Sequence, residues 1–357
     1  MDTSPPLLLS SPADVLAAVP YLLGFHPGES LVVIGLTGDP PGGRLCLTTR
    51  WDLPLDPDAV PRLASLLARE GVTQVIVAGY GPGAEVTPAV DAVRAQAGRS
   101  GLTVAEALRA DGGRFWSYLC ADAGCCPPEG TPYDPAAGEV PGQAEQHGMT
   151  ALRDRPALAG TLDPCTGPAR RAMREATARV AAETIGRARA CRDADALAAE
   201  FVADGIARVR AAVAGCADRR LSDEEAARLG AALSVIRVRD EAWTLIDDDR
   251  LKEQLDLWAD LTRRLEPRFT PPAAALLGLT AWRAGDGALA GIALERALSV
   301  DPGYSMARLL MHALAHFLSP GLLTERMPSP ADLDAAMGAP RMSWLLPLIA
   351  ILDEEAA

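Results

Sequence analysis

Three cysteines lie close together near the middle of the sequence, at Cys120, Cys125 and Cys126. Thiolates bind zinc and other soft metal ions, and neighbouring thiols can also form reversible disulfides. The spacing matches no common zinc motif, and adjacent cysteines rarely bind one metal ion unless the backbone is distorted. The thiols are therefore weak metal candidates, with redox chemistry and a buried structural cluster as alternatives. The candidates for the fourth ligand of a zinc ion are Cys165, His147 and His26.

A second candidate group lies in the segment GFHPGES, residues 24–30. His26, Glu29 and Ser30 place an imidazole, a carboxylate and a hydroxyl between an expected helix and an expected buried strand. Such a set can perform acid–base chemistry or bind a polar ligand. The alternative is a tight turn, in which glycine and proline set the backbone and His26 hydrogen-bonds to the main chain.

The segment GYGPG, residues 79–83, joins an expected strand to an expected helix. Backbone N–H groups around Gly79, Gly81 and Gly83 could hold a phosphate at the start of that helix. The spacing is neither that of the dinucleotide fingerprint nor that of the P-loop, and no lysine follows it. A simple strand-to-helix turn accounts for the same glycines.

The segment RFWSYLC, residues 114–120, alternates two kinds of side chain. Because neighbouring residues of a strand face opposite ways, Arg114, Trp116, Tyr118 and Cys120 would share one face. This mixture could line a pocket or a groove for a partner. The alternative is an amphipathic strand covered by a helix or by the following CCPPEG loop, in which case a buried Arg114 would need a partner.

Patterns that would name a reaction are missing from the sequence. His312 and His316 lie four residues apart, as two metal ligands on a helix would, but no HExxH pattern is present. We therefore expect this pair to lie on a packed or surface helix. The sequence also holds no G-x-S-x-G element, so nothing supports a hydrolase triad. Whether the chain is an enzyme, and with which cofactor, stays open.

Composition sets the broad class of the protein. The chain has 357 residues, 49% of them hydrophobic and 23% charged, which is enough for two folded domains. Its net charge of −13 disfavours bulk binding to nucleic acid or to an anionic membrane. The sequence contains no apolar run long enough to span a membrane. Seven cysteines without a basic signal segment predict reduced thiols and a cytoplasmic location.

Residues 1–123 predict an α/β domain, which is a mixed sheet with helices. Ser11 and Gly24 have the residue types that begin and end a helix, and Pro20 is expected to kink or end that helix early. Asp111-Gly112-Gly113 predicts a hairpin. The expected elements are helices starting at 12 and spanning 57–70 and 84–97, and strands at 30–36, 44–51, 73–80, 102–110 and 114–120.

The remainder of the chain has a different texture. Residues 124–165 are rich in proline and glycine and predict an ordered loop or linker. Residues 166–357 predict an all-α helical domain. Within it, Ser222 and Glu225 have the spacing of a capping box, in which each residue satisfies a backbone N–H of the other at the start of a helix.

One part of the helical domain, residues 271–302, resembles a tetratricopeptide-type hairpin of two helices. Gly278 and Ala290 are small at the two places where such helices must approach closely. A single hairpin cannot bury its own apolar face, so it must pack against neighbouring helices. Because no second copy follows, we expect a repeat-like helical bundle.

Three segments resemble an uncharacterised actinobacterial family, one of the families described as domains of unknown function. They are SPADVLAAVPYLLGFHPGESLVV at 11–33, CCPPEG at 125–130 and AWRAGDGALA at 281–290. The resemblance extends over nearly the whole chain. It implies a bacterial, cytoplasmic protein whose two parts belong together, and it implies no activity.

Three functions follow as hypotheses. The leading one is a non-enzymatic interaction or scaffold protein, in which the helical domain presents a groove to a protein partner. The second is an enzyme or sensor for a small molecule, with a site where GFHPGES, GYGPG and residues 114–126 meet. The third is a metal or redox module built on the cysteines.

Overall fold

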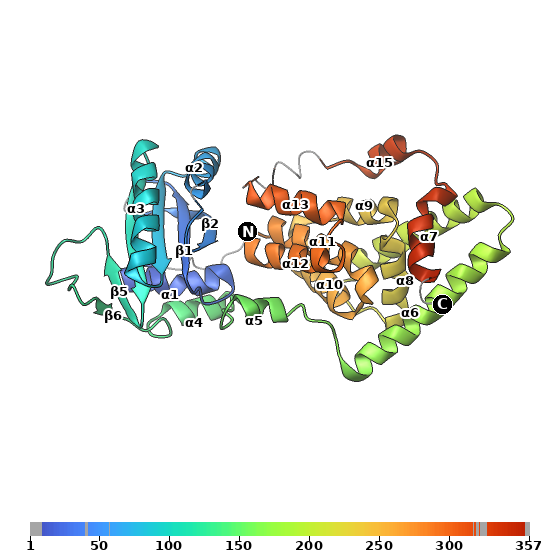
Figure 1. Cartoon of the computed structure of the whole chain (residues 1–357), viewed down its shortest axis with the longest axis horizontal. Helices are drawn as coiled ribbons and strands as arrows, with labels where there is room; N and C mark the ends of the chain where they lie inside the picture. Colours follow the sequence, from blue (N-terminus) through green and yellow to red (C-terminus); the bar gives the residue numbers. More distant parts are fainter. Residues whose placement is uncertain are drawn as a thin grey trace. The chain divides into compact units, whose positions relative to one another are not determined.

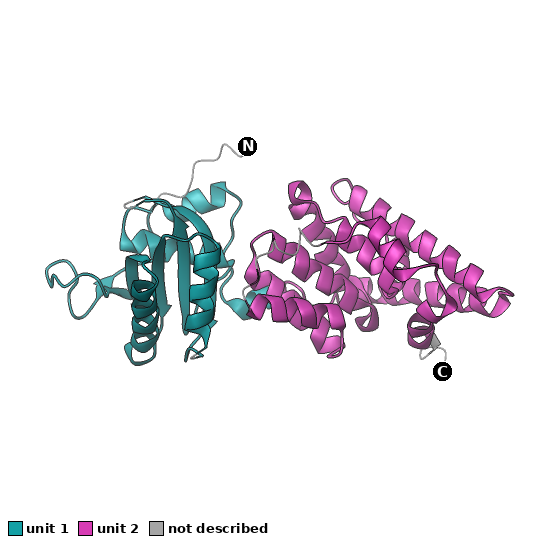
Figure 2. Cartoon of the chain, turned by 90° about the horizontal axis from the view of Figure 1, so that it is seen from above, with its two compact units in different colours: residues 1–160 teal, residues 161–357 magenta. Residues whose placement is uncertain are grey.

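The chain forms two compact units, residues 1–160 and residues 161–357, which we call unit 1 and unit 2 (Figure 2). Unit 1 combines a sheet with helices, and unit 2 is built from helices (Figure 1). The predicted fold class, an α/β part followed by a helical part, is confirmed. The computed structural model describes residues 9–39, 42–56, 58–316, 318, 321 and 327–353.

Unit 1 contains a six-stranded mixed sheet with the strand order β2-β1-β3-β4-β5-β6. Strands β3 and β4 run parallel, whereas the other neighbouring pairs are antiparallel. The start of β1 and the ends of β3 and β4 therefore meet at one edge of the sheet, which we call the carboxyl edge. The strands are β1 (Ser30–Thr37), β2 (Arg44–Asp52), β3 (Gln74–Tyr80), β4 (Thr103–Asp111), β5 (Arg114–Ser117) and β6 (Thr131–Pro132).

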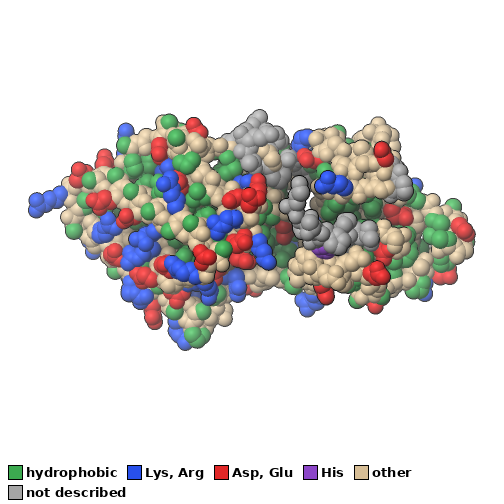
Figure 3. All heavy atoms as spheres, turned by 180° about the vertical axis from the view of Figure 1, so that it is seen from behind, with side chains coloured by type: hydrophobic (Ala, Val, Ile, Leu, Met, Phe, Trp, Pro, Cys, Tyr) green, Lys and Arg blue, Asp and Glu red, His purple; other side chains and the backbone are tan. Residues whose placement is uncertain are grey.

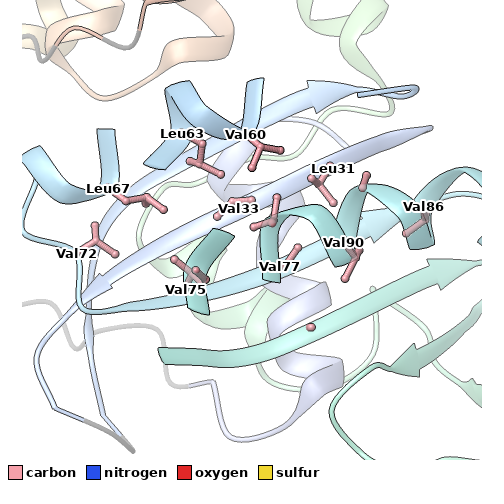
Figure 4. Close-up of a cluster of buried hydrophobic side chains, with 14 residues drawn as sticks. Leu31, Val33, Val60, Leu63, Leu67, Val72, Val75, Val77, Val86 and Val90 are labelled. Atoms are coloured by element: carbon pink, nitrogen blue, oxygen red, sulfur yellow. The ribbon is translucent and has the colours of Figure 1, made fainter. Parts of the chain in front are cut away.

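Helices α2 and α3 cover one face of this sheet (Figure 4). Leu31 and Val33 of β1 and Val77 of β3 point to this face and form one apolar cluster with Leu63 of α2 and Val90 of α3. Burial of each such side chain contributes about 1.5–3 kcal/mol. The helices of unit 1 are α1 (Pro12–Leu23), α2 (Ala59–Arg69), α3 (Gly83–Arg99), α4 (Val140–Gln146) and α5 (Arg155–Gly160).

Helix α1 begins and ends where the sequence predicts. The side chain of Ser11 accepts a hydrogen bond from the N–H of Asp14 at 3.1 Å, and Gly24 ends the helix with a φ of +76°. Pro20, however, does not end the helix, which continues to Leu23. The sheet supplies a substitute for the missing hydrogen bond. The hydroxyl of Tyr80 in β3 donates to the carbonyl oxygen of Leu16, to which Pro20 has no N–H to donate.

Residues 124–160, expected to be a loop or linker, contribute β6, α4 and α5 to unit 1. Val140 of α4 is buried in a cluster with Ala17 and Ala18 of α1. The apolar residues of α4 therefore dock on α1, although the surrounding sequence is rich in proline and glycine. The predicted hairpin at Gly112–Gly113 is present, but β5 ends at Ser117.

The described part of unit 2 contains helices and no strand. Figure 3 shows acidic and basic side chains interspersed over the face of unit 2 that it draws. Ion pairs occur in this unit, such as that of Arg228 with Glu183 at 2.6 Å. Short 3-10 turns lie at Asp248–Arg250, Pro267–Phe269 and Met342–Trp344. The helices are α6 (Gly167–Ala190), α7 (Ala194–Ala214), α8 (Asp223–Leu233), α9 (Ile236–Thr244), α10 (Leu251–Arg264), α11 (Thr270–Arg283), α12 (Gly287–Val300), α13 (Ser305–Ala315), α15 (Pro330–Met337) and α16 (Leu346–Asp353).

The predicted helical hairpin corresponds to α11 and α12. A Cβ atom at Gly278 would lie 2.7 Å from Cγ of Leu294 and 3.2 Å from the carbonyl oxygen of Ala290, so the helices touch where the sequence has small residues. Every residue of α11 from Thr270 to Trp282 is buried. Neighbouring helices therefore cover α11 on all sides.

Candidate functional site

The three clustered cysteines converge in the loop that follows β5. The Sγ atoms of Cys120, Cys125 and Cys126 all lie within 4.8 Å of one another. The Sγ atoms of the adjacent pair, Cys125 and Cys126, are 4.0 Å apart. All three cysteines are free; Cys125 is exposed and the other two are partly buried. The cluster is therefore accessible from solvent.

A turn at Asp122 brings the adjacent cysteines together. The carbonyl oxygen of Asp122 accepts hydrogen bonds from the N–H groups of Cys125, at 3.1 Å, and Cys126, at 2.7 Å. Its carboxylate accepts a third hydrogen bond from the N–H of Gly124 at 2.8 Å. These bonds close a tight turn of the kind that aspartate favours. The turn places two consecutive thiols beside Cys120, which an extended backbone would not do.

The thiols differ in acidity. A hydrogen bond from the Cys126 thiol, together with a backbone hydrogen bond at Asp122, lowers the pKa of Cys120. The same interaction with Cys120, followed by burial, raises the pKa of Cys126 to about 12. Of these two cysteines, Cys120 is therefore the thiol that ionises more readily, while Cys126 keeps its proton. Because the thiolate is the reactive form of cysteine, Cys120 is the more reactive of these two thiols.

Arg114 and Trp116 hold the base of the cysteine loop. Arg114 Nη1 donates a hydrogen bond of 2.6 Å to the carbonyl oxygen of Gly130, and Trp116 Nε1 donates one of 2.9 Å to that of Pro128. Gly130 lies directly against the indole, since a Cβ atom there would be 2.5 Å from Cε2. This geometry supports the alternative in which the CCPPEG loop covers the strand, and it gives Arg114 its hydrogen-bonding partner.

Sequence reasoning missed Arg109, which connects the loop base to the start of α3. Its guanidinium lies 3.6 Å from the centre of the Trp116 ring, and its Nη1 is 3.9 Å from the carboxylate of Asp111. A Cβ atom at Gly83 would lie 2.9 Å from the same Nη1. The signal was present in the predicted hairpin, because Arg109 and Trp116 are directly paired across β4 and β5.

Part of the predicted small-molecule site meets at the carboxyl edge. A Cβ atom at Gly81 would lie 3.7 Å from Cα of Glu29, so the GFHPGES and GYGPG segments are neighbours there. Gly81 has a φ of +127°, and its N–H donates to the carbonyl oxygen of Ala110 at 2.9 Å. Gly79 has a packing role, because a Cβ atom there would lie 2.2 Å from Cγ1 of Val86 in α3. These contacts account for the glycines as a strand-to-helix turn and as a close approach of the two elements.

Other residues predicted for this site point elsewhere. Ser30 is buried and lies opposite Tyr80, whose side chain reaches α1. The hydroxyl of Tyr118 instead lies 2.8 Å from that of Thr87 in α3, on the opposite face of the sheet. Ser30 and Tyr118 therefore cannot line one pocket.

The fourth zinc ligands predicted within unit 1, His26 and His147, do not join the thiols. Within the described ranges, no His, Asp, Glu or further Cys side chain completes a group of ligand atoms with these three. His26 is exposed, and its backbone N–H donates to the carbonyl oxygen of Leu152 at 2.9 Å, as a turn residue would. Cys165 belongs to unit 2.

The histidine pair of the helical unit lies on an exposed part of α13, as expected. The ring centres of His312 and His316 are 3.9 Å apart, and Nδ1 of His316 is 2.9 Å from the carbonyl oxygen of His312. The two rings contact each other at an angle of 34°, and the ring of His316 hydrogen-bonds to the backbone at the end of α13.

These features define a class of protein with two units, an α/β unit that carries an accessible cluster of three thiols and a unit of packed helices. Residues 12–321 match the family described as a domain of unknown function, DUF4192, and the chain belongs to that family. The expected membership of a family of unknown function is thereby confirmed. The comparisons with curated proteins and with solved structures gave no match. Among the described helices, none has both the length and the apolar character needed to cross a membrane.

Proposed function

We propose that this protein binds one zinc ion through the thiolates of Cys120, Cys125 and Cys126. The observation that carries the proposal is the mutual distance of the three Sγ atoms, all within 4.8 Å. A Zn–S bond of about 2.3 Å and tetrahedral angles require sulfur atoms about 3.8 Å apart. Cys125 and Cys126, at 4.0 Å, nearly meet this requirement already. Small side-chain rotations complete the site.

The surrounding contacts favour binding because they restrict the conformations of the cysteine loop. The Asp122 turn sets the spacing of the adjacent thiols, and the hydrogen bonds of Arg114 and Trp116 fix the far end of the loop at Gly130 and Pro128. A preorganised loop loses less conformational entropy when the ion binds.

A zinc ion held by three protein thiolates keeps one coordination position for water or an external ligand. No fourth side chain among the described residues completes the group, so this arrangement fits an ion that exchanges ligands rather than a closed structural centre. Soft thiolate ligands also suit Cu(I), which accepts three sulfur ligands in a plane. Experiments must therefore determine what occupies the fourth coordination position of zinc and whether the site prefers zinc or Cu(I).

Titration of the reduced full-length protein with Zn²⁺ in a calorimeter tests the proposal. We expect one ion per chain, and we expect Cys120→Ser, Cys125→Ser and Cys126→Ser each to weaken binding strongly. Cys46→Ser is the matched control, because Cys46 is an exposed thiol of unit 1 on β2, outside the cluster. Binding that is absent, or that survives all three cluster variants, would refute the proposal.

Cobalt substitution gives the ligand set. Three thiolates on Co²⁺ produce intense sulfur-to-metal charge-transfer absorption, which each cluster variant should reduce and Cys46→Ser should leave unchanged. A parallel titration with Cu(I) ranks the two metals. Formation of a Cys125–Cys126 or Cys120–Cys126 disulfide without metal binding would instead favour the redox hypothesis.

The interaction or scaffold role remains a prediction, as do the protein partner and the cytoplasmic location. Because α11 is buried from Thr270 to Trp282, a partner of unit 2 would contact other helices of that unit. Among the described residues of unit 2, three large apolar side chains are more than half exposed: Leu309 of α13, Leu346 of α16 and Ile236 of α9.

A further inference from the structure

An open groove runs along α3 in unit 1. It has a volume of about 580 Å³ and is bounded on one side by α3 and on the other by the start of α2 and the segment before it. Its walls are mostly small and apolar, including Val60 and Pro61 of α2 and Ala84, Pro88 and Ala92 of α3. The groove lies on the same side of the sheet as α2 and α3, apart from the cysteine loop.

Residues of α3 that are seven positions apart line the groove in rows. Glu85, Ala92 and Arg99 all line the groove, and their spacing places them in one row along the helix. Pro88 and Ala95 form a second row of the same spacing beside it. Two helices that pack along each other make contact through rows of residues with this spacing.

The two ends of the central row carry opposite charges. The carboxylate of Glu85 is exposed and has no hydrogen-bonding or ionic partner within the described residues. Arg99 is also exposed and donates to the neutral side chain of Gln96, at 2.6 and 3.1 Å, rather than to a carboxylate. The middle of the row is the methyl group of Ala92. Along this row the side chains are therefore acidic at Glu85, small at Ala92 and basic at Arg99.

We infer that this groove is the interface of a homodimer, in which α3 of one chain packs antiparallel to α3 of a second copy across a two-fold axis at Ala92. Ala92 is seven residues from Glu85 and seven from Arg99, so a two-fold axis there brings each Glu85 opposite the partner's Arg99. The same axis places Pro88 opposite Gln96 and Ala89 opposite Ala95. A two-fold interface must be self-complementary in this way.

The side-chain sizes fit the same arrangement. Small residues near the axis allow the helices to approach closely, and the long side chains of Glu85 and Arg99 span the wider separation at the ends. With about 1.5 Å of rise per residue, Glu85 and Arg99 are about 21 Å apart along the helix, so a shallow crossing of about 20° keeps both pairs within reach. This inference is independent of metal binding.

Sedimentation analysis of the full-length protein with exchanged charges tests the interface. We expect the wild-type chain to be a dimer. Glu85→Arg places two arginines together at each end, and Arg99→Glu places two glutamates together, so each single variant should raise the dimer dissociation constant at least about tenfold. The double variant, Glu85→Arg with Arg99→Glu, restores opposite charges and should return the dissociation constant to near that of the wild type.

Matched controls lie on the same helix outside the groove. Asp91→Arg and Arg94→Glu make the same charge changes at two α3 residues that pair with each other at 3.1 Å and do not line the groove. They should leave the dimer unchanged, and circular dichroism should show that all variants are folded.

Three outcomes would overturn the inference. One is a monomeric wild-type chain throughout the micromolar range. Another is a dimer that neither single exchange weakens, which would place the interface elsewhere. The third is a double variant no better than the single ones, which would mean that Glu85 and Arg99 do not meet. A monomer that copurifies with a small molecule displaced by Ala92→Glu would assign the groove to that ligand instead.

Discussion

The hydroxyl of Tyr80 donates a hydrogen bond of 3.4 Å to the backbone carbonyl of Leu16. This carbonyl lies four residues before Pro20, which has no N–H with which to bond to it. Both Tyr80 and Leu16 are buried, and burial raises the pKa of Tyr80 well above its usual value, so the hydroxyl stays protonated and able to donate. A side chain of β3 thus replaces the helical hydrogen bond that Pro20 removes from α1.

Loss of this hydroxyl should destabilise unit 1. We expect Tyr80→Phe to lower the free energy of unfolding by about 1 kcal/mol, because a buried carbonyl loses its donor. In a Pro20→Ala background the helix can make its own bond, so the same change should have less effect. Urea denaturation of the four proteins forms a double-mutant cycle. Equal losses in both backgrounds would show that Tyr80 does not act through the Leu16 carbonyl.

The conformation of the cysteine loop, and with it the proposed zinc affinity, should depend on Gly130. A Cβ atom there would lie 2.5 Å from the Trp116 ring, and the φ of +82° is unfavourable for alanine. Gly130→Ala should therefore shift the loop and weaken zinc binding about tenfold or more. Gly138→Ala is the control, since Gly138 has a φ of +92° but no atom near its Cβ position. Calorimetric titration measures the zinc affinity of both variants. Equal affinities for the two would show that the packing of Gly130 on Trp116 does not affect zinc binding.

Zinc affinity should rise with pH. The ion binds thiolates and therefore displaces protons, and the pKa of Cys126, raised to about 12, leaves that thiol protonated at neutral pH. Lowering the pH adds protons that compete with the metal, so the dissociation constant should increase between about pH 8 and pH 6. Cys126→Ser should release about one proton fewer on binding. Titration in buffers of different ionisation enthalpy counts these protons, and a pH-independent affinity would contradict thiolate ligation.

An ion pair inside unit 2 should be necessary for stability. Arg237 and Glu241 lie one turn apart on α9 at 2.8 Å, with side chains 3% and 0% exposed, and Arg237 also binds Asp334 of α15 at 2.7 Å. Arg237→Ala leaves Glu241 with only the more exposed Arg210 and should cost about 3–5 kcal/mol in the free energy of unfolding.

Replacing both partners separates the charge from the packing. Arg237→Met with Glu241→Leu removes the unpaired charge and should recover most of the stability lost in Arg237→Ala. Thermal unfolding compares the variants. An equal loss in the single and double variants would mean that the contacts of Arg237 with α15, and not the buried pair, determine the stability.

Features that depend on nearby residues were predictable. Helix α1 lies between its caps Ser11 and Gly24, and the capping box of Ser222 and Glu225 is present. Two glycines with positive φ form the turn of the β4–β5 hairpin. Each of these is set by hydrogen bonds or backbone preferences within a few residues. The close approach at Gly278 is what the resemblance to a tetratricopeptide-type hairpin implied, since a small residue lies where the two helices meet.

The sequence by itself determined the two kinds of unit, the helix ends and the presence of three neighbouring thiols, since periodicity and local hydrogen bonding fix such features. Only the tertiary structure decided that Arg109 stacks on Trp116, that Ser30 and Tyr118 face opposite sides of the sheet, and that Tyr80 completes α1. Strand register and helix docking bring these residues together from distant parts of the chain. A pattern of residue types does not specify such pairings, because their free energy depends on packing across the whole unit.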